Sequence, residues 1–275
     1  MSAIAVLRRW RHGRLKALDP IWVVLGRVYR FFARKLGKPV SHRIGPFGPF
    51  LLQSEFAFSN FENWGSGHNN GFRACIEACR GCQCVFDVGS HIGLVTLPMS
   101  RAIAPSGRVY SFEPSAANAY VLKRHLSDNK IDNVEVIESL VGQQDEERVL
   151  FFEDSSPSGM NSLVIKRDAS RYAHTRRRQI SLDTFCATRA LAPEVIKIDV
   201  EGAELAVLRG AANTLRRYQP KIFLSVHPDH LKLLGSSTEE LVALVQANGY
   251  VWRKIDGSMV EAVRPGEYLL LPAPR

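Results

Sequence analysis

The sequence lacks a long hydrophobic run, so we expect no transmembrane segment. The longest uncharged apolar stretch near the N-terminus is Pro20–Gly26, whereas a helix that spans a bilayer needs about 20 apolar residues. The apolar stretch Met1–Leu7 is also short, and arginines follow it at once, which is not the pattern of a signal peptide. We therefore expect a cytoplasmic protein, whose five cysteines stay reduced.

Excess positive charge is missing from most of the chain, although the net charge of the whole is +9. Residues 1–45 hold eleven Lys or Arg and one acid, Asp19, whereas the other 230 residues sum to −1. A nucleic-acid enzyme usually carries its basic residues around its active site. The charge distribution therefore argues against a nucleic-acid partner, and we interpret the run Arg176–Arg178 as the edge of a solvated loop.

The basic residues 1–45 are predicted to form a helical arm. Asp19 is a suitable helix N-cap, and Pro20 suits the first helical position. On a helical wheel of Pro20–Lys38 the basic residues gather on one face and most apolar residues on the other. Two interpretations stay open. Either residues 1–40 make a peripheral contact with the inner face of a membrane, or the arm packs its apolar face on the body.

The rest of the chain divides into a cap segment, residues 46–83, and a main domain, residues 84–275. Within the main domain, strands are predicted at Cys84–Val88, Arg108–Phe112, Val134–Ser139, Arg148–Phe152, Val195–Val200, Lys221–Val226, Tyr250–Lys254 and Tyr268–Leu271. Helices are predicted at Ile92–Ala104, Ser115–Asn129, Ala203–Tyr218 and Thr238–Asn248. This alternation predicts an α/β fold with a mostly parallel, doubly wound sheet and an antiparallel edge strand.

The turn after the first strand lacks one glycine of a dinucleotide-binding motif. It has Gly89 and Gly93, but His91 stands where the middle glycine of that motif would be. Glu113 ends the second strand, and a carboxylate there can accept hydrogen bonds from both hydroxyls of a ribose. Asp87 ends the first strand and can accept a hydrogen bond from a cationic amine. Two acids without a nearby basic residue suit a cationic nucleoside, and S-adenosylmethionine is the predicted cofactor.

At these residues the chain resembles the FkbM-type methyltransferases, a branch of the Rossmann-like, S-adenosylmethionine-dependent class I enzymes. The resemblance covers residues 55–255 and rests on four blocks: Val85–Gly93; Val109–Pro114 with Asn118; Asn161–Leu163 with Ile180–Asp183; and Ile196–Glu204 with Val207–Ala211. The fourth block is the most specific. The chain departs from the family twice, because the family usually has Asn at the position of His91 and often ends its fifth strand in Glu-x-His, whereas this chain has Ser225-Val226-His227.

The resemblance and the strand ends together give the candidate site residues. The candidate cofactor-binding residues are Asp87, Gly89, Ser90, His91, Gly93, Glu113, Pro114 and Leu140. The candidate catalytic residues are Asp199, Glu201 and His227, since two of them follow the fourth main strand and a histidine oriented by a carboxylate is a suitable general base. Alternatively, Lys197 and one acid form a structural ion pair and His227 caps a helix.

Metal chemistry is considered at two places. Asp199, Glu201 and His227 could ligate a divalent cation, but nothing in their spacing demands one, and no metal is predicted. Cys75, Cys79 and Cys82 have the Cys-x3-Cys-x2-Cys spacing of radical S-adenosylmethionine enzymes. They precede the first strand of a different cofactor fold, so we expect reduced, partly buried thiols.

The sequence therefore predicts an O-methyltransferase that acts on a hydroxyl of a sugar or a lipid-linked glycan. The preference for oxygen comes from the resemblance and the candidate base, and the lipid link comes only from the basic arm. Two alternatives stay open: methylation of a polyketide, a peptide, a nucleoside cap or another small molecule, or a non-catalytic cofactor-binding protein whose arm docks on a membrane or partner. The sequence leaves the oligomeric state open.

Overall fold

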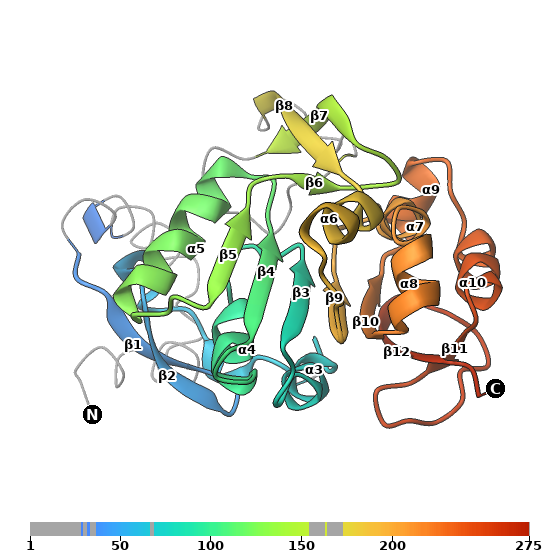
Figure 1. The fold of residues 1–275 in the computed structure, drawn as a ribbon. Coiled ribbons are helices and arrows are strands. Elements are labelled where there is room, and N and C mark those ends of the chain that lie inside the picture. The colour runs from blue at the N-terminus through green and yellow to red at the C-terminus, as the bar shows by residue number, and fades with distance from the viewer. Residues whose placement is uncertain are drawn as a thin grey trace, which may run out of the picture.

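The computed structural model describes residues 29, 32–33, 37–66, 69–153, 163 and 173–274. A seven-stranded sheet forms its centre, in the order β11-β12-β10-β9-β3-β4-β5 (Figure 1). The strands are β3 (Cys84–Val88), β4 (Arg108–Phe112), β5 (Val134–Ile137), β9 (Val195–Ile198), β10 (Lys221–Val226), β11 (Tyr250–Arg253) and β12 (Gly266–Pro272). The pairs from β10 to β5 are parallel, and β12 runs antiparallel to both of its neighbours. The expected Rossmann-like α/β sheet is confirmed, with its antiparallel strand one place in from the edge.

The central strands are apolar because helices cover both faces of the sheet (Figure 1). All five residues of β3 are buried, and their side chains alternate between two cores. Phe86 packs in the core that contains α6, α7, α8 and α10, whereas Val85 packs with α3, α4 and α5. The helices are α3 (Phe72–Ala78), α4 (Thr96–Ala102), α5 (Ala116–Asp128), α6 (Leu182–Arg189), α7 (Glu204–Arg209), α8 (Ala212–Tyr218), α9 (Pro228–Leu233) and α10 (Thr238–Ala247).

The strand order places a switch point beside β3. The chain passes from β3 to β4 on one side and later returns to β9 on the other side. The helical connections therefore diverge between β3 and β9, and in such sheets ligands bind outside the carboxyl ends of the strands at this point. Val88 and Ile198 are in register here, so the turns that follow them lie side by side.

A second sheet has three strands, β6 (Leu140–Val141), β7 (Glu146–Glu153) and β8 (Ala173–Ile180), in the order β6-β8-β7. The expected strand at Arg148–Phe152 is part of β7. The interpretation of Arg176–Arg178 as a loop edge is wrong, because these residues lie in β8 and pair with Val149 and Leu150 of β7. The predicted third main strand likewise ends early, since Leu140 and Val141 leave the main sheet to join this one. Asn161 and Ser162, from the third block of the resemblance, lie outside the described residues.

Two helices differ from their predicted bounds, and both differences trace to glycines. The predicted helix Ala203–Tyr218 is split into α7 and α8. Gly210 lies at the break, where a Cβ atom would come 2.0 Å from the carbonyl oxygen of Gly142, so the close approach of the small sheet requires glycine. Helix α4 begins at Thr96 instead of Ile92, because Gly93 has φ +91° and cannot be part of a right-handed helix. Helices α6 and α9 were not predicted.

The N-terminal region forms a hairpin of β1 (Val40–Ile44) and β2 (Phe47–Leu52), followed by the short 3-10 turns η2 (Ser54–Phe56) and η3 (Phe61–Asn63). The hairpin spans the predicted boundary between arm and cap. Of the arm helix, Tyr29, Phe32 and Ala33 are described: the Tyr29 hydroxyl donates to the Ser54 carbonyl, and Ala33 is buried. These contacts favour the packing interpretation for this part of the arm, and the rest of it lies outside the described residues. Among the described helices, none is both long and apolar enough to cross a bilayer.

Candidate functional site

The turn that follows β3 is shaped by two residues with positive φ. Gly89 has φ +81°, and a Cβ atom on it would lie 1.9 Å from the carbonyl oxygen of Asp199. The chain that follows β9 therefore leaves no room for a side chain at Gly89. His91 has φ +51°, in the left-handed region where Asn, Asp and His are enriched among residues with a side chain. This conformation accounts for His91 at a position where the resembling family usually has Asn.

Two of the candidate cofactor-binding residues, Gly93 and Asp87, contact other parts of the protein. Gly93 does not line the cavity: a Cβ atom there would lie 2.4 Å from Leu122 Cδ1, so the glycine lets the turn pack against α5. Asp87 is fully buried and does not line the cavity either. Its Oδ2 atom accepts a hydrogen bond of 2.6 Å from the Thr96 hydroxyl. The cation beside Asp87 is therefore one of the protein's own side chains.

That cation is Lys197, which links the first and fourth main strands. Its Nζ atom lies 3.3 Å from Asp87 Oδ1 and 3.8 Å from Asp199 Oδ2, and it donates to the Gly89 carbonyl at 2.8 Å. Burial lowers the pKa of Lys197, but the charges of Asp87 and Asp199 outweigh this effect and raise the pKa above its usual value. Lys197 therefore takes part in a buried ion pair, as the alternative prediction expected, and its nearer partner is Asp87.

Glu113 anchors the glycine turn from the end of β4. Its carboxylate accepts hydrogen bonds from the backbone N–H of His91 at 2.8 Å and of Ser115 at 2.9 Å, and from Asn118 Nδ2 at 3.2 Å. Glu113 is nevertheless almost completely buried. Burial raises its pKa to about 7, against the lowering effect of the three donors and of Lys197. Glu113 therefore changes between its protonated and its ionised form near neutral pH.

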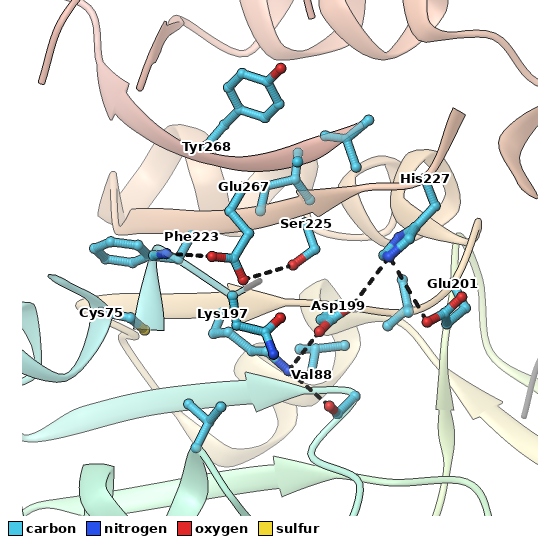
Figure 2. A pocket seen from close by; sticks show the side chains of 18 of the residues that line it. Cys75, Val88, Lys197, Asp199, Glu201, Phe223, Ser225, His227, Glu267 and Tyr268 are labelled. Carbon is cyan, nitrogen blue, oxygen red and sulfur yellow. Dashed lines mark hydrogen bonds and ion pairs between the residues drawn. The ribbon is translucent and has the colours of Figure 1, made fainter. Parts of the chain in front are cut away.

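A cavity of about 1170 Å³ opens at the carboxyl ends of β3, β4, β9 and β10. It is lined by the predicted residues Gly89, Ser90, His91, Glu113, Pro114, Leu140, Asp199, Glu201 and His227. Sequence reasoning did not single out Ser139, Glu267 or the apolar wall formed by Trp64, Phe72 and Phe223, which come from distant segments. Figure 2 shows Lys197, Asp199, Glu201 and His227 converging on one side of this cavity.

His227 is held in place by Glu204, to which the sequence pattern alone assigned no role. The Nδ1 atom of His227 lies 2.6 Å from Glu204 Oε1, and Glu204 is fully buried at the start of α7. On the other side of the ring, Nε2 lies 3.7 Å from Asp199 Oδ1 and 3.9 Å from Glu201 Oε1. His227 is also the N-cap residue of α9, but its side chain makes no capping hydrogen bond.

The two histidines of the cavity have opposite electrostatics. Burial lowers the pKa of His227, but the hydrogen bond to Glu204 and the charges of Glu204, Asp199 and Glu201 raise it to about 9. Burial and the nearby Lys197 lower the pKa of His91 to about 4. At neutral pH His227 is therefore protonated and His91 is neutral. The Nε2 atom of His91 is buried, and no described residue hydrogen-bonds to it.

A carboxylate lies beside the position where the resembling family often has Glu in its fifth strand. Ser225 occupies that position, and Glu267 of the antiparallel β12 is in register with it. Glu267 Oε1 accepts a hydrogen bond of 3.5 Å from the Ser225 hydroxyl, and Oε2 accepts one from the backbone N–H of Gly71 (Figure 2). No signal along the sequence could have found this residue, because the pairing of β10 with β12 places it there.

The cysteines do not form a metal centre with one another. All five are free and buried. Burial raises the pKa of Cys84 to about 12 and that of Cys186 to about 11, so neither is a reactive thiolate at neutral pH. Within the described part of the chain, the group of three or more potential metal ligands that lie close together is Asp199, Glu201 and His227.

Comparisons with known proteins found a family model and several similar methyltransferases. The family described as "Methyltransferase FkbM domain" matches residues 87–252. "Methyltransferase 1" of Beauveria bassiana is 26% identical over 145 residues, which are 46% of this chain and 57% of that protein. The crystal structure of methyltransferase FkbM from Methylobacillus flagellatus is 18% identical, with a TM-score of 0.45 over 70% of this chain and 44% of that one. An S-adenosylmethionine-dependent O-methyltransferase from Thermotoga maritima is 10% identical, with a TM-score of 0.42 over 75% of this chain and 65% of that one. This chain thus spans less than two thirds of the length of each of these proteins.

Proposed function

The chain belongs to the FkbM methyltransferase family, and from that premise we propose that it uses S-adenosylmethionine to methylate a hydroxyl group of a sugar or a lipid-linked glycan. The observation that carries the proposal is the convergence of the turn after β3, Glu113 and the Asp199–His227 pair on one cavity. A cavity of about 1170 Å³ is larger than a typical pocket for one small ligand, so it has room for both a cofactor and an acceptor.

The residues of the turn fit a nucleoside that carries an amino acid. Glu113 offers the remaining acceptor site of its carboxylate to a ribose hydroxyl, since a carboxylate has about four acceptor sites and the protein fills three. The buried Nε2 atom of His91 has no partner among the described residues, and a neutral imidazole there can bond to a polar group of the cofactor. Gly89, Ser90, Pro114 and Leu140 line the same part of the cavity.

When bound, S-adenosylmethionine supplies a methyl group on a sulfonium: a C–O bond to the acceptor forms as the C–S bond breaks, and adenosylhomocysteine leaves. The protein's tasks are to align the acceptor hydroxyl and to take its proton. Asp199 is placed for the second task, because it follows β9 at the cavity wall and its carboxylate is partly exposed. His227 has a pKa of about 9, so near neutral pH it acts first as a cation that orients Asp199 and Glu201.

A turnover assay with matched variants tests the proposal. Asp199→Asn keeps the shape of the side chain but removes the base, and we expect it to bind adenosylhomocysteine like the wild type while methyl transfer falls about 100-fold or more. Glu138→Gln, which changes an exposed carboxylate paired with Lys123, is the control and should leave both quantities unchanged. Full activity of a folded Asp199→Asn protein would remove the catalytic assignment. Binding of cofactor without turnover on any cell-extract fraction would favour the non-catalytic alternative.

The acceptor class is best tested in cells. Mass spectrometry of the glycans and lipids of a deletion strain should find one methyl group missing from a sugar. A missing methyl group on a peptide or polyketide would favour the other acceptor classes instead.

A peripheral membrane contact through residues 1–40 stays a prediction, and the basic residues before Tyr29 carry it. Replacing Arg8, Arg9, Arg11 and Arg14 with serine changes neither Tyr29 nor Ala33, the two residues that contact Ser54 of the body. The wild type should then sediment with anionic vesicles and the variant should not, because clustered basic residues contribute about 1 kcal/mol each at an anionic surface. Equal sedimentation of both proteins would remove the membrane role of the arm.

A further inference from the structure

Three side chains at the cavity wall converge on one point, where His227 lies within ion-pair distance of two carboxylates. One ligand atom each from Asp199, Glu201 and His227 lies within 4.8 Å of the other two. The distances from His227 Nε2 are 3.7 Å to Asp199 Oδ1 and 3.9 Å to Glu201 Oε1. A charge-assisted hydrogen bond between such groups measures about 2.7–2.9 Å. Both distances from His227 Nε2 are longer than that. Two ligand atoms of one small cation lie at a similar distance from each other.

The outer atom of each of these side chains is held by another residue. His227 Nδ1 lies 2.6 Å from Glu204 Oε1, and Glu201 Oε2 lies 3.0 Å from His230 Nδ1. Asp199 Oδ2 lies 3.8 Å from the ammonium of Lys197. The other atoms, Asp199 Oδ1, Glu201 Oε1 and His227 Nε2, face one another across the shared space. Figure 2 shows His227 pointing between the two carboxylates.

Glu204 is the partner that a metal-binding histidine requires. Ligating histidines almost always donate their second ring N–H to a carboxylate, carbonyl or water, which fixes the ring and leaves the other nitrogen free to coordinate. Glu204 is fully buried, and its Oε1 atom also accepts a hydrogen bond of 3.1 Å from the Gly202 N–H. A buried carboxylate fixed in this way costs solvation energy, and it aims Nε2 of His227 at the space between Asp199 and Glu201.

We propose that Asp199, Glu201 and His227 bind one divalent metal ion of the first transition row, and that the ion takes the place of the proton on His227 Nε2. The imidazole ligand favours such an ion over Mg²⁺ or Ca²⁺, which prefer oxygen ligands alone. Three protein ligands leave open positions, and all three residues line the cavity, so an acceptor oxygen can occupy one of them. This last step rests on the proposed methyl transfer, because a metal-bound hydroxyl loses its proton more readily. Binding of the ion itself does not rest on it.

Titration of the full-length, chelator-treated protein with MnCl2, followed by electron paramagnetic resonance, tests the site. We expect one Mn²⁺ bound per chain, with spin-echo modulation from a coordinated nitrogen. His227→Ala should abolish the nitrogen signal, and Asp199→Asn and Glu201→Gln should each weaken binding at least tenfold. Glu204→Gln touches no ion directly and should weaken binding about 10–100-fold. Glu138→Gln, which changes a residue outside the cavity lining in an exposed ion pair with Lys123, should bind like the wild type.

The measurement needs neither cofactor nor acceptor, so it separates this proposal from the proposed function. Absence of Mn²⁺ and Co²⁺ binding at millimolar concentration would overturn the metal site and leave methyl transfer standing. Equal binding by the wild type and by folded Asp199→Asn and Glu201→Gln proteins would also overturn it. Circular dichroism of each variant identifies any that has unfolded, and the nitrogen modulation of the wild type then decides by itself whether an imidazole is a ligand.

Discussion

Protonation of Glu113 should control cofactor affinity near neutral pH. The carboxylate is almost fully buried, and burial raises its pKa from 4.5 to about 7. Only the ionised form can accept a hydrogen bond from a ribose hydroxyl while it still accepts those of the protein. With a pKa of about 7, the ionised fraction rises about tenfold between pH 6 and pH 8. The affinity for a ribose-containing ligand should therefore rise about tenfold over the same range.

Methylthioadenosine is a suitable probe, because it has the adenine and ribose but no amino-acid part that would titrate. Isothermal titration calorimetry at pH 6, 7 and 8 should show the rise in affinity for the wild type. Glu113→Gln removes a hydrogen bond to a charged acceptor, so its free energy of binding at pH 8 should be weaker by about 1.5–3 kcal/mol. Its affinity for methylthioadenosine should be the same at pH 6, 7 and 8. Glu135→Gln, which changes an exposed acid paired with Arg189, should behave like the wild type.

The same group gives a second readout in stability. Because the folded-state pKa of Glu113 is raised, the folded protein binds the proton more tightly than the unfolded chain. Its contribution to the free energy of unfolding therefore falls as the pH rises from 4.5 to about 7, by about 3 kcal/mol at most. Glu113→Gln should remove this slope from urea-unfolding curves. A wild-type affinity that is flat from pH 6 to pH 8, or a Glu113→Gln protein that binds as tightly as the wild type at pH 8, would refute the reasoning.

Three further predictions concern the turn and its ion pair. Gly89→Ala should destabilise the protein by several kcal/mol in thermal unfolding, since its Cβ atom would lie 1.9 Å from the Asp199 carbonyl. The control is Gly81→Ala, where φ is +73° and a Cβ atom would meet no atom within 4 Å. This variant should lose only about 1–2 kcal/mol. Lys197→Met should cost about 3–5 kcal/mol in urea unfolding, because it leaves the buried Asp87 without its cation, and the added change Asp87→Asn should restore part of this. His91→Asn should change stability by less than about 0.5 kcal/mol, whereas His91→Val should cost about 1–3 kcal/mol, and equal stabilities of the two variants would contradict the role given to φ +51°.

The central strands were predictable because their signal is local. Strands β3, β4 and β10 begin and end where the sequence predicts, since each is a short apolar run bounded by polar or turn residues, as expected for a strand buried on both faces. Where the prediction failed, a distant contact had overruled the local pattern. The predicted helix Ala203–Tyr218 is split at Gly210, which packs against Gly142, and Arg176–Arg178 lie in a strand that pairs with β7.

The candidate site was partly predictable for the same reason. Gly89, Glu113 and Asp199 follow predicted strands, and parallel strands bring their carboxyl ends to one edge of the sheet. The residues that were missed lie near the site only through folding. Glu267 reaches it because β12 runs antiparallel beside β10, and the role of Glu204 depends on its contact with His227 at the end of β10.

The sequence by itself determined the doubly wound α/β fold, the methyltransferase family and the strand ends that line the cavity. These features depend on neighbouring residues, whose hydrophobicity and turn preferences can be interpreted in order along the chain. Only the tertiary structure decided which charge meets which. In the folded protein Asp87 forms an ion pair with Lys197 instead of binding a ligand. His227 lies between Glu204 on one side and Asp199 and Glu201 on the other. Such pairings depend on strand order and register, and the strength of each depends on burial, which no single segment of the sequence contains.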